Sequence, residues 1–136
     1  MTRKVVIFFA LAGVIALAAI GAGSWVRERG EQRDALERAR ALTGGDPLRA
    51  ATAIGRLGCG SCHDIPGVPG ANGQVGPPLA HMGARVYIAG VMPNTPENMI
   101  LWIRWPQGVL PKSVMPNMGA SEAESRDIAA YLFSLQ

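Results

Sequence analysis

The residues whose types and spacing point most directly to chemistry are Cys59-Gly60-Ser61-Cys62-His63. Two cysteines separated by two residues, with a histidine directly after the second, form the attachment pattern of c-type haem. Each thiol can add to one vinyl group of the porphyrin, and the next imidazole then lies where it can coordinate the iron. The motif therefore predicts one haem c bound covalently by Cys59 and Cys62, with His63 as an iron ligand.

Two other chemistries use the same cysteine spacing. A Cys-x-x-Cys pair can be a thiol–disulfide redox centre, but this chain, with 17 glycines and 10 prolines, shows no thioredoxin-like βαβ pattern. The pair can also form half of a zinc site, which needs two further ligands. The sequence has two cysteines in all, and His81 is its only other histidine. Haem attachment is therefore the best interpretation.

Size and charge narrow the class of protein. A chain of 136 residues has room for one small domain and an extension. Its core would be thin, and a covalently held porphyrin would add apolar mass to it. From Asp46 onward, six basic residues are balanced by six acidic ones, so the net charge of +3 comes from the N-terminal third. A folded part with balanced charge argues against nucleic-acid binding and names no charged partner.

The N-terminal segment predicts a membrane span. Val5–Trp25 contains no ionisable residue, and about 20 apolar residues in a helix match the hydrocarbon thickness of a bilayer. A cleavable signal is the alternative, because small residues occur before a possible cleavage point, at Ala19, Gly21, Ala22 and Gly23. Signal cores are usually shorter, about 7–15 residues, and Trp25 suits an interfacial anchor. We therefore expect residues 1–25 to be a retained transmembrane anchor.

Residues 26–45 read as a charged linker. Acid–base partners recur at helical spacing, as at Asp34 and Arg38, which is typical of a solvated helix. Its apolar stripe is narrow and consists of Ala35, Leu36, Ala39 and Leu42. A docking surface for a partner is possible in principle, but the pattern favours a plain helical spacer. Gly44-Gly45 is a helix stop.

Three helices are expected in the remaining residues, 46–136. Asp46 followed by Pro47 predicts the start of a first helix that ends at Gly58. Its apolar residues with helical spacing are Leu48, Ala51, Ile54 and Leu57. Asn94 or Thr95 can cap a second helix, which must stop at Pro106.

The last of these helices starts at a capping box. Ser121 with Glu124 three residues later has the residue types of that motif. Long loops are expected at 64–75 and 107–119, where proline and glycine are frequent.

With the elements in this order, residues 46–136 resemble a class I cytochrome c. The resemblance rests on the short helix that leads into the haem motif, on Gly76-Pro77-Pro78-Leu79, on Met115-Pro116 in a loop, and on a closing helix with Tyr131-Leu132. It implies an all-α fold, the small class I cytochrome c fold around one covalent haem, preceded here by the transmembrane helix and the charged linker. The anchor and the long insert after the haem motif make the chain look like a bacterial membrane-bound variant.

The resemblance also implies roles for individual residues. His63 and Met115 would be the axial ligands of the iron. The Pro77 carbonyl would hold the other ring nitrogen of His63, and Leu79 would pack on the porphyrin.

Further roles follow from the same resemblance. Trp102 falls where the family often has an aromatic residue beside the haem, and Arg85 could pair with a haem propionate. Gly55 and Tyr131 match the place where the first and last helices cross closely.

The sixth iron ligand has alternatives among the six methionines of the chain. Met118 lies three residues after Met115, and Met92 also precedes a proline but comes before the middle helix. Thioether sulfur suits an iron that alternates between two oxidation states, and Met/His ligation raises the reduction potential. His81 as the ligand would instead give a bis-histidine haem of low potential.

The orientation of the anchor is predicted from the family, against the charge rule. Arg3 and Lys4 precede the span, whereas five arginines follow it in the linker, and the positive-inside rule would put that linker in the cytoplasm. The family attaches haem outside the cytoplasm. We therefore expect a single-pass protein of the bacterial cytoplasmic membrane with its haem domain on the periplasmic side.

These features predict an electron carrier and not an enzyme. Two protein ligands would leave the iron no open position for a small-molecule substrate. The expected partners are redox proteins of the respiratory chain, such as a quinol-oxidising complex and a terminal oxidase, with no nucleic acid involved. One alternative is a haem subunit fixed in a larger oxidase or dehydrogenase complex. Another is a five-coordinate haem peroxidase or gas sensor, for which His81 is the obvious distal residue.

Overall fold

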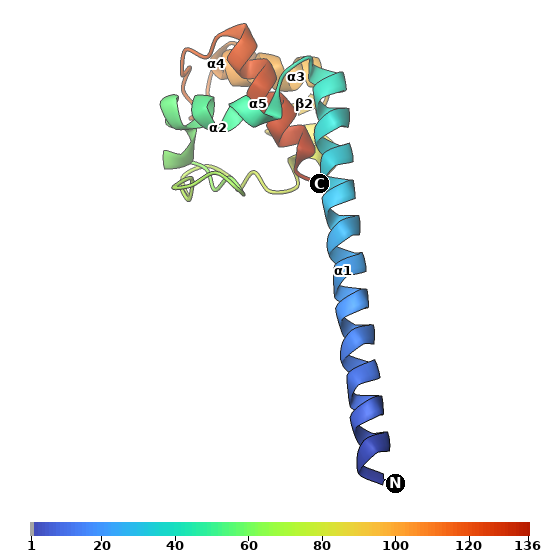
Figure 1. The fold of residues 1–136 in the computed structure, drawn as a ribbon. Helices are drawn as coiled ribbons and strands as arrows, with labels where there is room; N and C mark the ends of the chain where they lie inside the picture. The colour runs from blue at the N-terminus through green and yellow to red at the C-terminus, as the bar shows by residue number, and fades with distance from the viewer. Residues whose placement is uncertain (1) are drawn as a thin grey trace. The chain divides into compact units, whose positions relative to one another are not determined.

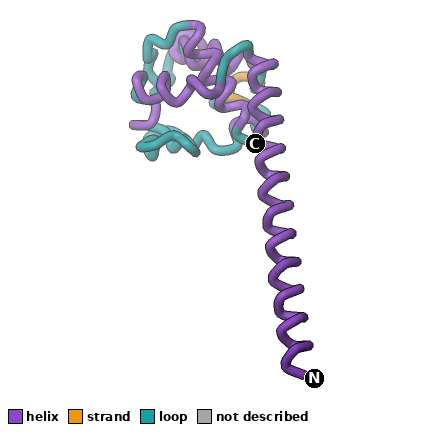
Figure 2. The backbone as a smooth tube through the Cα atoms, in the orientation of Figure 1, coloured by secondary structure: helices purple, strands orange, loops and turns teal. Residues whose placement is uncertain are grey.

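The computed structural model describes residues 2–136 (Figures 1 and 2), so Met1 of the expected anchor lies outside the described residues. In chain order the elements are α1 (Thr2–Thr43), α2 (Pro47–Arg56), the 3₁₀ turns η1 (Cys59–Ser61) and η2 (Met82–Ala84), β1 (Tyr87–Ile88), β2 (Met92–Pro93), α3 (Pro96–Arg104), α4 (Pro106–Val109) and α5 (Glu122–Ser134). The chain separates into two compact units, residues 1–34 and 35–136. The predicted all-α class is confirmed. The structure adds a short antiparallel hairpin, in which the strands β1 and β2 have two residues each.

The first unit consists of the N-terminal part of α1. From Ile7 onward this helix is long and apolar enough to cross a membrane. The large apolar side chains that the structure describes in it, from Ile7 onward, are exposed, and at its polar end the Arg29 guanidinium stacks 3.8 Å from the centroid of the Trp25 ring. Such a cation–π pair suits a position where apolar and aqueous surroundings meet.

The last turns of α1 belong to the second unit. Ala35, Ala39 and Thr43 are buried, whereas Leu42 is 59% exposed. The predicted stripe is therefore wrong at Leu42, and the buried face continues to Thr43. The helix ends as predicted, because Gly44 adopts a left-handed φ of 68°, which glycine reaches without steric cost.

Helix α2 begins as predicted but buries a different face. The Asp46 carboxylate accepts a hydrogen bond from Leu48 N and caps the helix, with Pro47 in its first turn. Ile54 is buried as expected, but Leu48 is 73% exposed, so that part of the predicted face is wrong. Periodicity gives the spacing of a buried stripe, whereas its rotation depends on where α5 packs, and here the alanines Ala50 and Ala53 face inward.

Helices α3 and α4 follow one another with a break at Trp105, directly before Pro106. Thr95, one of the two predicted caps, accepts from Asn98 N through its hydroxyl. The predicted loop after Pro106 is partly wrong, because its first residues form the short helix α4. The buried side chains of α3 are Met99, Ile100, Trp102 and Ile103.

Helix α5 is the centre of the second unit. It starts at the predicted capping box, in which the Ser121 hydroxyl and the Glu124 carboxylate each accept a backbone N–H. It packs against α2, α3 and η2, and Figure 1 shows α2 and α3 beside it. The implied close crossing at Gly55 is wrong, because a Cβ there would meet nothing within 4 Å. The small buried residues of the two helices are instead alanines, such as Ala53 on α2 and Ala129 on α5.

Candidate haem-binding site

The two cysteines lie in a tight turn that directly follows α2. Gly58 adopts a left-handed φ of 69° and ends the helix. The Cys62 and His63 backbone N–H groups both donate to the Cys59 carbonyl, over 3.2 and 3.0 Å. Both cysteines are half-buried and free, which is the state that thioether formation requires.

The surroundings of the cysteines argue against the two alternative chemistries. Burial raises the pKa of the Cys59 thiol, whereas the attacking cysteine of a dithiol oxidoreductase has a lowered pKa. Among the described residues, no cluster of three or more His, Cys, Asp and Glu side chains could hold a metal ion. A zinc site at this turn would therefore lack ligands.

His63 is oriented by a backbone carbonyl. Its Nδ1 lies 2.8 Å from the Pro77 carbonyl oxygen, the contact that the sequence resemblance implies. A carbonyl can only accept, so Nδ1 carries the proton and the lone pair is on Nε2. That tautomer presents Nε2 to a metal, and the bond at Nδ1 makes the ring a stronger ligand.

Gly76 lies flat against the imidazole of His63. A Cβ at this position would come within 2.4 Å of the ring atom Cε1 and 2.7 Å of Nδ1. Any other residue would push the ring aside. Glycine is therefore required here because the imidazole lies so close to its Cα. Its φ is not in the left-handed region, so the backbone conformation is not the reason.

The long insert after the haem motif folds back on the cysteine turn. Gly73 N donates to the Gly60 carbonyl over 3.0 Å, and a Cβ at Gly60 would meet Ala71 at 2.6 Å. Near the start of the insert, the Tyr131 hydroxyl on α5 donates to the Pro66 carbonyl. The insert is therefore a packed wall of the site (the yellow-green loop in Figure 1).

The methionines differ in their surroundings. Met115 is half-buried and packs against the core, and its backbone N–H donates to the Ser113 hydroxyl over 3.1 Å. Met118 is 38% exposed, and its Cε lies 4.0 Å from the Cβ position of Gly58, beside the haem turn. Met82 is buried in the core, and Met92 lies on the hairpin strand β2.

The other predicted residues are placed as follows. Leu79 is half-buried against the core and Trp102 is buried within it. The Arg85 guanidinium donates to the carbonyls of Pro78 and Ala80. His81 Nδ1 lies 2.7 Å from the Gln136 carbonyl, on a different segment from the cysteine turn.

These residues fit a covalent haem c. Haem c needs two thiols for attachment and two axial ligands for its iron. The site offers the thiols of Cys59 and Cys62, an imidazole with its Nε2 lone pair available, and the half-buried thioether of Met115. Cys59 and Cys62 would hold the porphyrin, His63 and Met115 would coordinate its iron, and Leu79 and Trp102 would add apolar contact.

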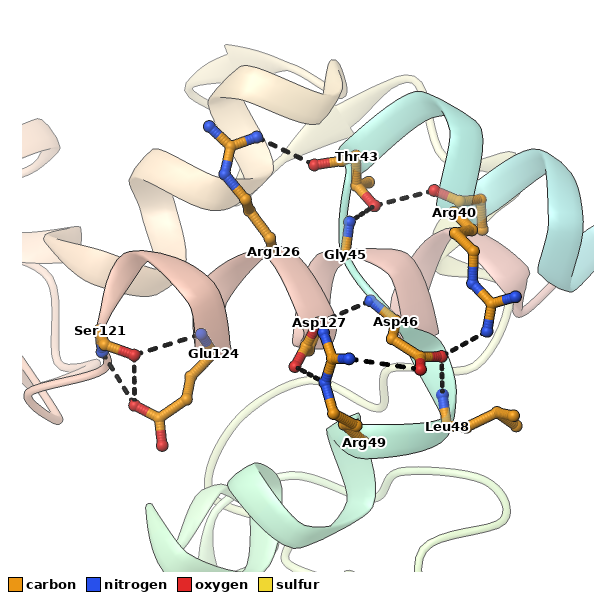
Figure 3. Close-up of polar contacts among 11 residues, drawn as sticks. Arg40, Thr43, Gly45, Asp46, Leu48, Arg49, Ser121, Glu124, Arg126 and Asp127 are labelled. Atoms are coloured by element: carbon orange, nitrogen blue, oxygen red, sulfur yellow. Dashed lines mark hydrogen bonds and ion pairs between the residues drawn. The ribbon is translucent and has the colours of Figure 1, made fainter.

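A polar frame fixes the start of α2 against α5 (Figure 3). Asp127 Oδ1 accepts from the Asp46 backbone N–H over 2.6 Å, and the Arg49 guanidinium donates to both Asp127 oxygens over 2.8 and 2.9 Å. Burial opposes ionisation of Asp127, but the bonds from Arg49 and Asp46 outweigh it and hold the pKa of this carboxyl below its usual value. The frame sets the direction in which α2 leads into the haem turn.

Sequence reasoning missed the structural roles of Gly60, Gly73 and Asn94. The two glycines allow the insert to lie flat on the haem turn, and the Asn94 amide donates to the carbonyls of Met82 and Arg85 instead of capping α3. The frequent glycines around the two cysteines could have indicated close packing of the backbone there. They do not predict which segments come into contact.

Comparison with known proteins supplies an independent observation. The family model described as cytochrome c matches residues 48–136. Cytochrome c oxidase subunit 2 of Alkalihalophilus pseudofirmus is 38% identical over 79 residues, which cover 57% of this chain and 22% of that relative. No solved structure matches.

Proposed function

This chain belongs to the cytochrome c family, which carries covalent haem c and transfers electrons, and we propose that it does so with His63 and Met115 as axial ligands, at the outer face of a bacterial cytoplasmic membrane. Haem c supplies an iron that alternates between the ferrous and ferric states. The observation that best supports this ligation is the bond from His63 Nδ1 to the Pro77 carbonyl.

The residues of the site suit electron transfer without substrate chemistry. A histidine and a methionine that both bind the iron leave no position for O₂ or another small ligand. The rigid contacts of His63 with Gly76 and Pro77 keep the ring in one orientation. Little rearrangement then accompanies a change of oxidation state.

The N-terminal helix supports the proposed location. It is apolar enough to span a membrane, and an anchored carrier would diffuse in the membrane plane between a quinol-oxidising complex and a terminal oxidase. We propose both complexes as partners because the first can donate single electrons and the second can accept them. Encounters between such carriers and their partners are weak and small in area.

A second function is favoured by the relative found in the comparison. Its printed name is cytochrome c oxidase subunit 2, and the match covers 57% of the present chain. The chain could accordingly be a haem subunit fixed in an oxidase complex. Purification from mildly solubilised membranes separates the two functions, because a fixed subunit would remain in constant ratio with the other subunits.

Carbon monoxide tests the ligation. We expect the reduced protein to show almost no spectral change with carbon monoxide, because both axial positions are filled. Met115→Ala should bind carbon monoxide and have a lower reduction potential, while the matched variant Met118→Ala should do neither. Prompt binding by the unaltered protein would favour a peroxidase or gas sensor, and an effect of Met118→Ala alone would move the ligand to that residue.

Mass spectrometry of the protein purified from membranes tests the anchor and the haem together. We expect an intact N-terminus and the mass of one haem on the polypeptide. A chain that begins after the small residues at 19–23 would show that the apolar segment is a cleaved signal.

A further inference from the structure

The segment Gly76–Ala80 is held to the haem turn through its backbone. Gly76 N donates to the Cys62 carbonyl over 2.7 Å, and Leu79 N donates to the Asp64 carbonyl over 2.8 Å. The carbonyl of the intervening Pro77 faces His63 Nδ1. Every contact on this side reaches the residues that surround the proposed iron ligand.

The opposite side of the same segment is held by Arg85. Its Nη2 donates to the Pro78 carbonyl over 2.6 Å and to the Ala80 carbonyl over 3.1 Å. Pro77 and Pro78 have no N–H, so their carbonyls are the backbone groups through which hydrogen bonds can fix them. His63 takes one of these carbonyls and Arg85 takes the next.

Arg85 is itself held in place by Asn94. The Asn94 amide Nδ2 donates to the Arg85 carbonyl over 2.9 Å and to the Met82 carbonyl over 2.8 Å. Met82 is buried in the core. A continuous series of contacts thus leads from the core through Asn94 and Arg85 to the proline pair that faces His63.

We propose that Arg85 is a positioning residue that fixes the Pro77-Pro78 segment and thereby the hydrogen bond on His63 Nδ1. This inference rests on the proposed role of His63 as axial ligand. It gives Arg85 a function different from the propionate pairing expected from the sequence. A strong bond at Nδ1 increases the electron donation of the ring to iron and favours the ferric state. Loosening the segment should therefore raise the reduction potential.

The experiment follows the Nδ1 proton of His63 by NMR in the reduced, haem-loaded protein. Arg85→Gln should increase its exchange rate with solvent about tenfold, the size expected when a hydrogen bond of ordinary strength is lost. Arg85→Lys should give an intermediate rate, because its ammonium keeps the charge and some donors but lacks the planar fork.

A second variant separates position from charge. Asn94→Ala removes no charge, and it should both accelerate this exchange and raise the potential. The matched control is Asn98→Ala, which removes a similar amide-to-carbonyl bond, 2.9 Å to Pro93, outside the series. It should leave exchange and potential unchanged.

The outcomes distinguish this inference from the proposed ligation. If exchange is unchanged in both Arg85→Gln and Asn94→Ala, the positioning role is wrong, and a lower potential in Arg85→Gln alone would indicate propionate pairing. If the His63 ring signals of the unaltered protein lack the shifts caused by haem, the ligation itself is wrong, whatever the variants do.

Discussion

Among the residues beside the proposed iron ligand, Gly76 tolerates substitution least, although its backbone φ is not in the left-handed region. Gly76 leaves no room for a side chain because the imidazole of His63 fills the space where its Cβ would be. The same ring is bonded to the Pro77 carbonyl. Steric contact on its face and a hydrogen bond at Nδ1 together fix both the position and the tautomer of one side chain.

Gly76→Ala should displace the imidazole of His63. We expect a loss of stability of about 1–3 kcal/mol, as for other overpacked sites, and weakened low-spin absorbance in the haem protein. Denaturant titration and visible spectra measure the two effects. The matched control is Gly55→Ala on α2, where the added methyl meets nothing within 4 Å and should be neutral or stabilising by about 0.5–1 kcal/mol. Equal effects of the two substitutions would contradict this account of Gly76.

At the scale of elements, the compact unit that holds the haem site is longer than the part of the chain that matches the family. The unit begins at residue 35, whereas the family model matches from residue 48. Thr43 at the end of α1 is buried, and its carbonyl accepts from the Arg126 guanidinium on α5 over 3.0 Å. Gly45 lies directly on the backbone of α5 (Figure 3). The end of the charged helix is thus a packed element of the second unit and not only a spacer.

Gly45→Ala should weaken this packing. The added Cβ would approach the Arg126 carbonyl oxygen to 2.1 Å, and a helix backbone cannot move away as a side chain can. We expect a loss of about 1–3 kcal/mol in the free energy of unfolding. Gly30→Ala, in the exposed part of α1, meets nothing within 4 Å and is the control. If both variants melted like the unaltered protein, residues 43–45 would not be packed as described.

The capping box of α5 gives a prediction for pH. Hydrogen bonds from the Ser121 hydroxyl and backbone N–H, followed by one from Arg56, lower the pKa of Glu124 from 4.5 to about 2. A lowered pKa stabilises the fold above the unfolded-state value, and this contribution is lost as the pH falls from 4.5 toward about 2.

The measurement is the melting temperature against pH at low salt, because Glu124 is only half-buried and salt screens its ion pair with the exposed Arg56. Glu124→Gln should lose less stability than the unaltered protein across this window. Glu97→Gln on α3, whose carboxylate forms none of the ion pairs found among the described residues, is the control and should follow the unaltered curve. Parallel curves for all three proteins would show that the capping carboxylate does not titrate in this way.

At the scale of the whole molecule, charge is separated from the haem site. Residues 58–80 and 105–121, which carry the cysteines, His63 and Met115, contain one acid and one base, Asp64 and Lys112. The ion pairs of the second unit lie instead among residues of α1, α2, α3, α5 and Asp46. Apart from Arg85, whose guanidinium donates to the Pro78 and Ala80 carbonyls, the surface next to the proposed ligands therefore has little charge with which to steer a partner.

Electron transfer to soluble acceptors should accordingly depend weakly on salt. Raising the ionic strength from about 10 to about 200 mM should change the second-order rate by less than about threefold, whereas steered association changes by about tenfold or more. Stopped-flow reactions with one anionic and one cationic acceptor measure this, and Lys112→Gln should alter neither by much. A steep and opposite dependence for the two acceptors would reveal a charged contact surface.

The sequence by itself determined the covalent chemistry, the helix ends and the apolar N-terminal segment. These features depend on neighbours in the chain: two cysteines at fixed spacing, Asp46 before Pro47, Ser121 before Glu124, and a run of apolar residues. Local spacing and local hydrogen bonds are enough to specify them, so the predictions of caps and stops are confirmed at Asp46, Thr95 and Ser121.

Only the tertiary structure decided which residues face one another. Leu48 and Leu42 have helical spacing with buried residues yet are exposed, because the rotation of α2 and α1 is set by the contacts of Asp46 and Thr43 with α5. The contact of Gly76 with His63 and the attachment of Arg85 to the proline pair join segments that are distant in sequence. Packing between such segments is a property of the folded chain, and no local pattern encodes it.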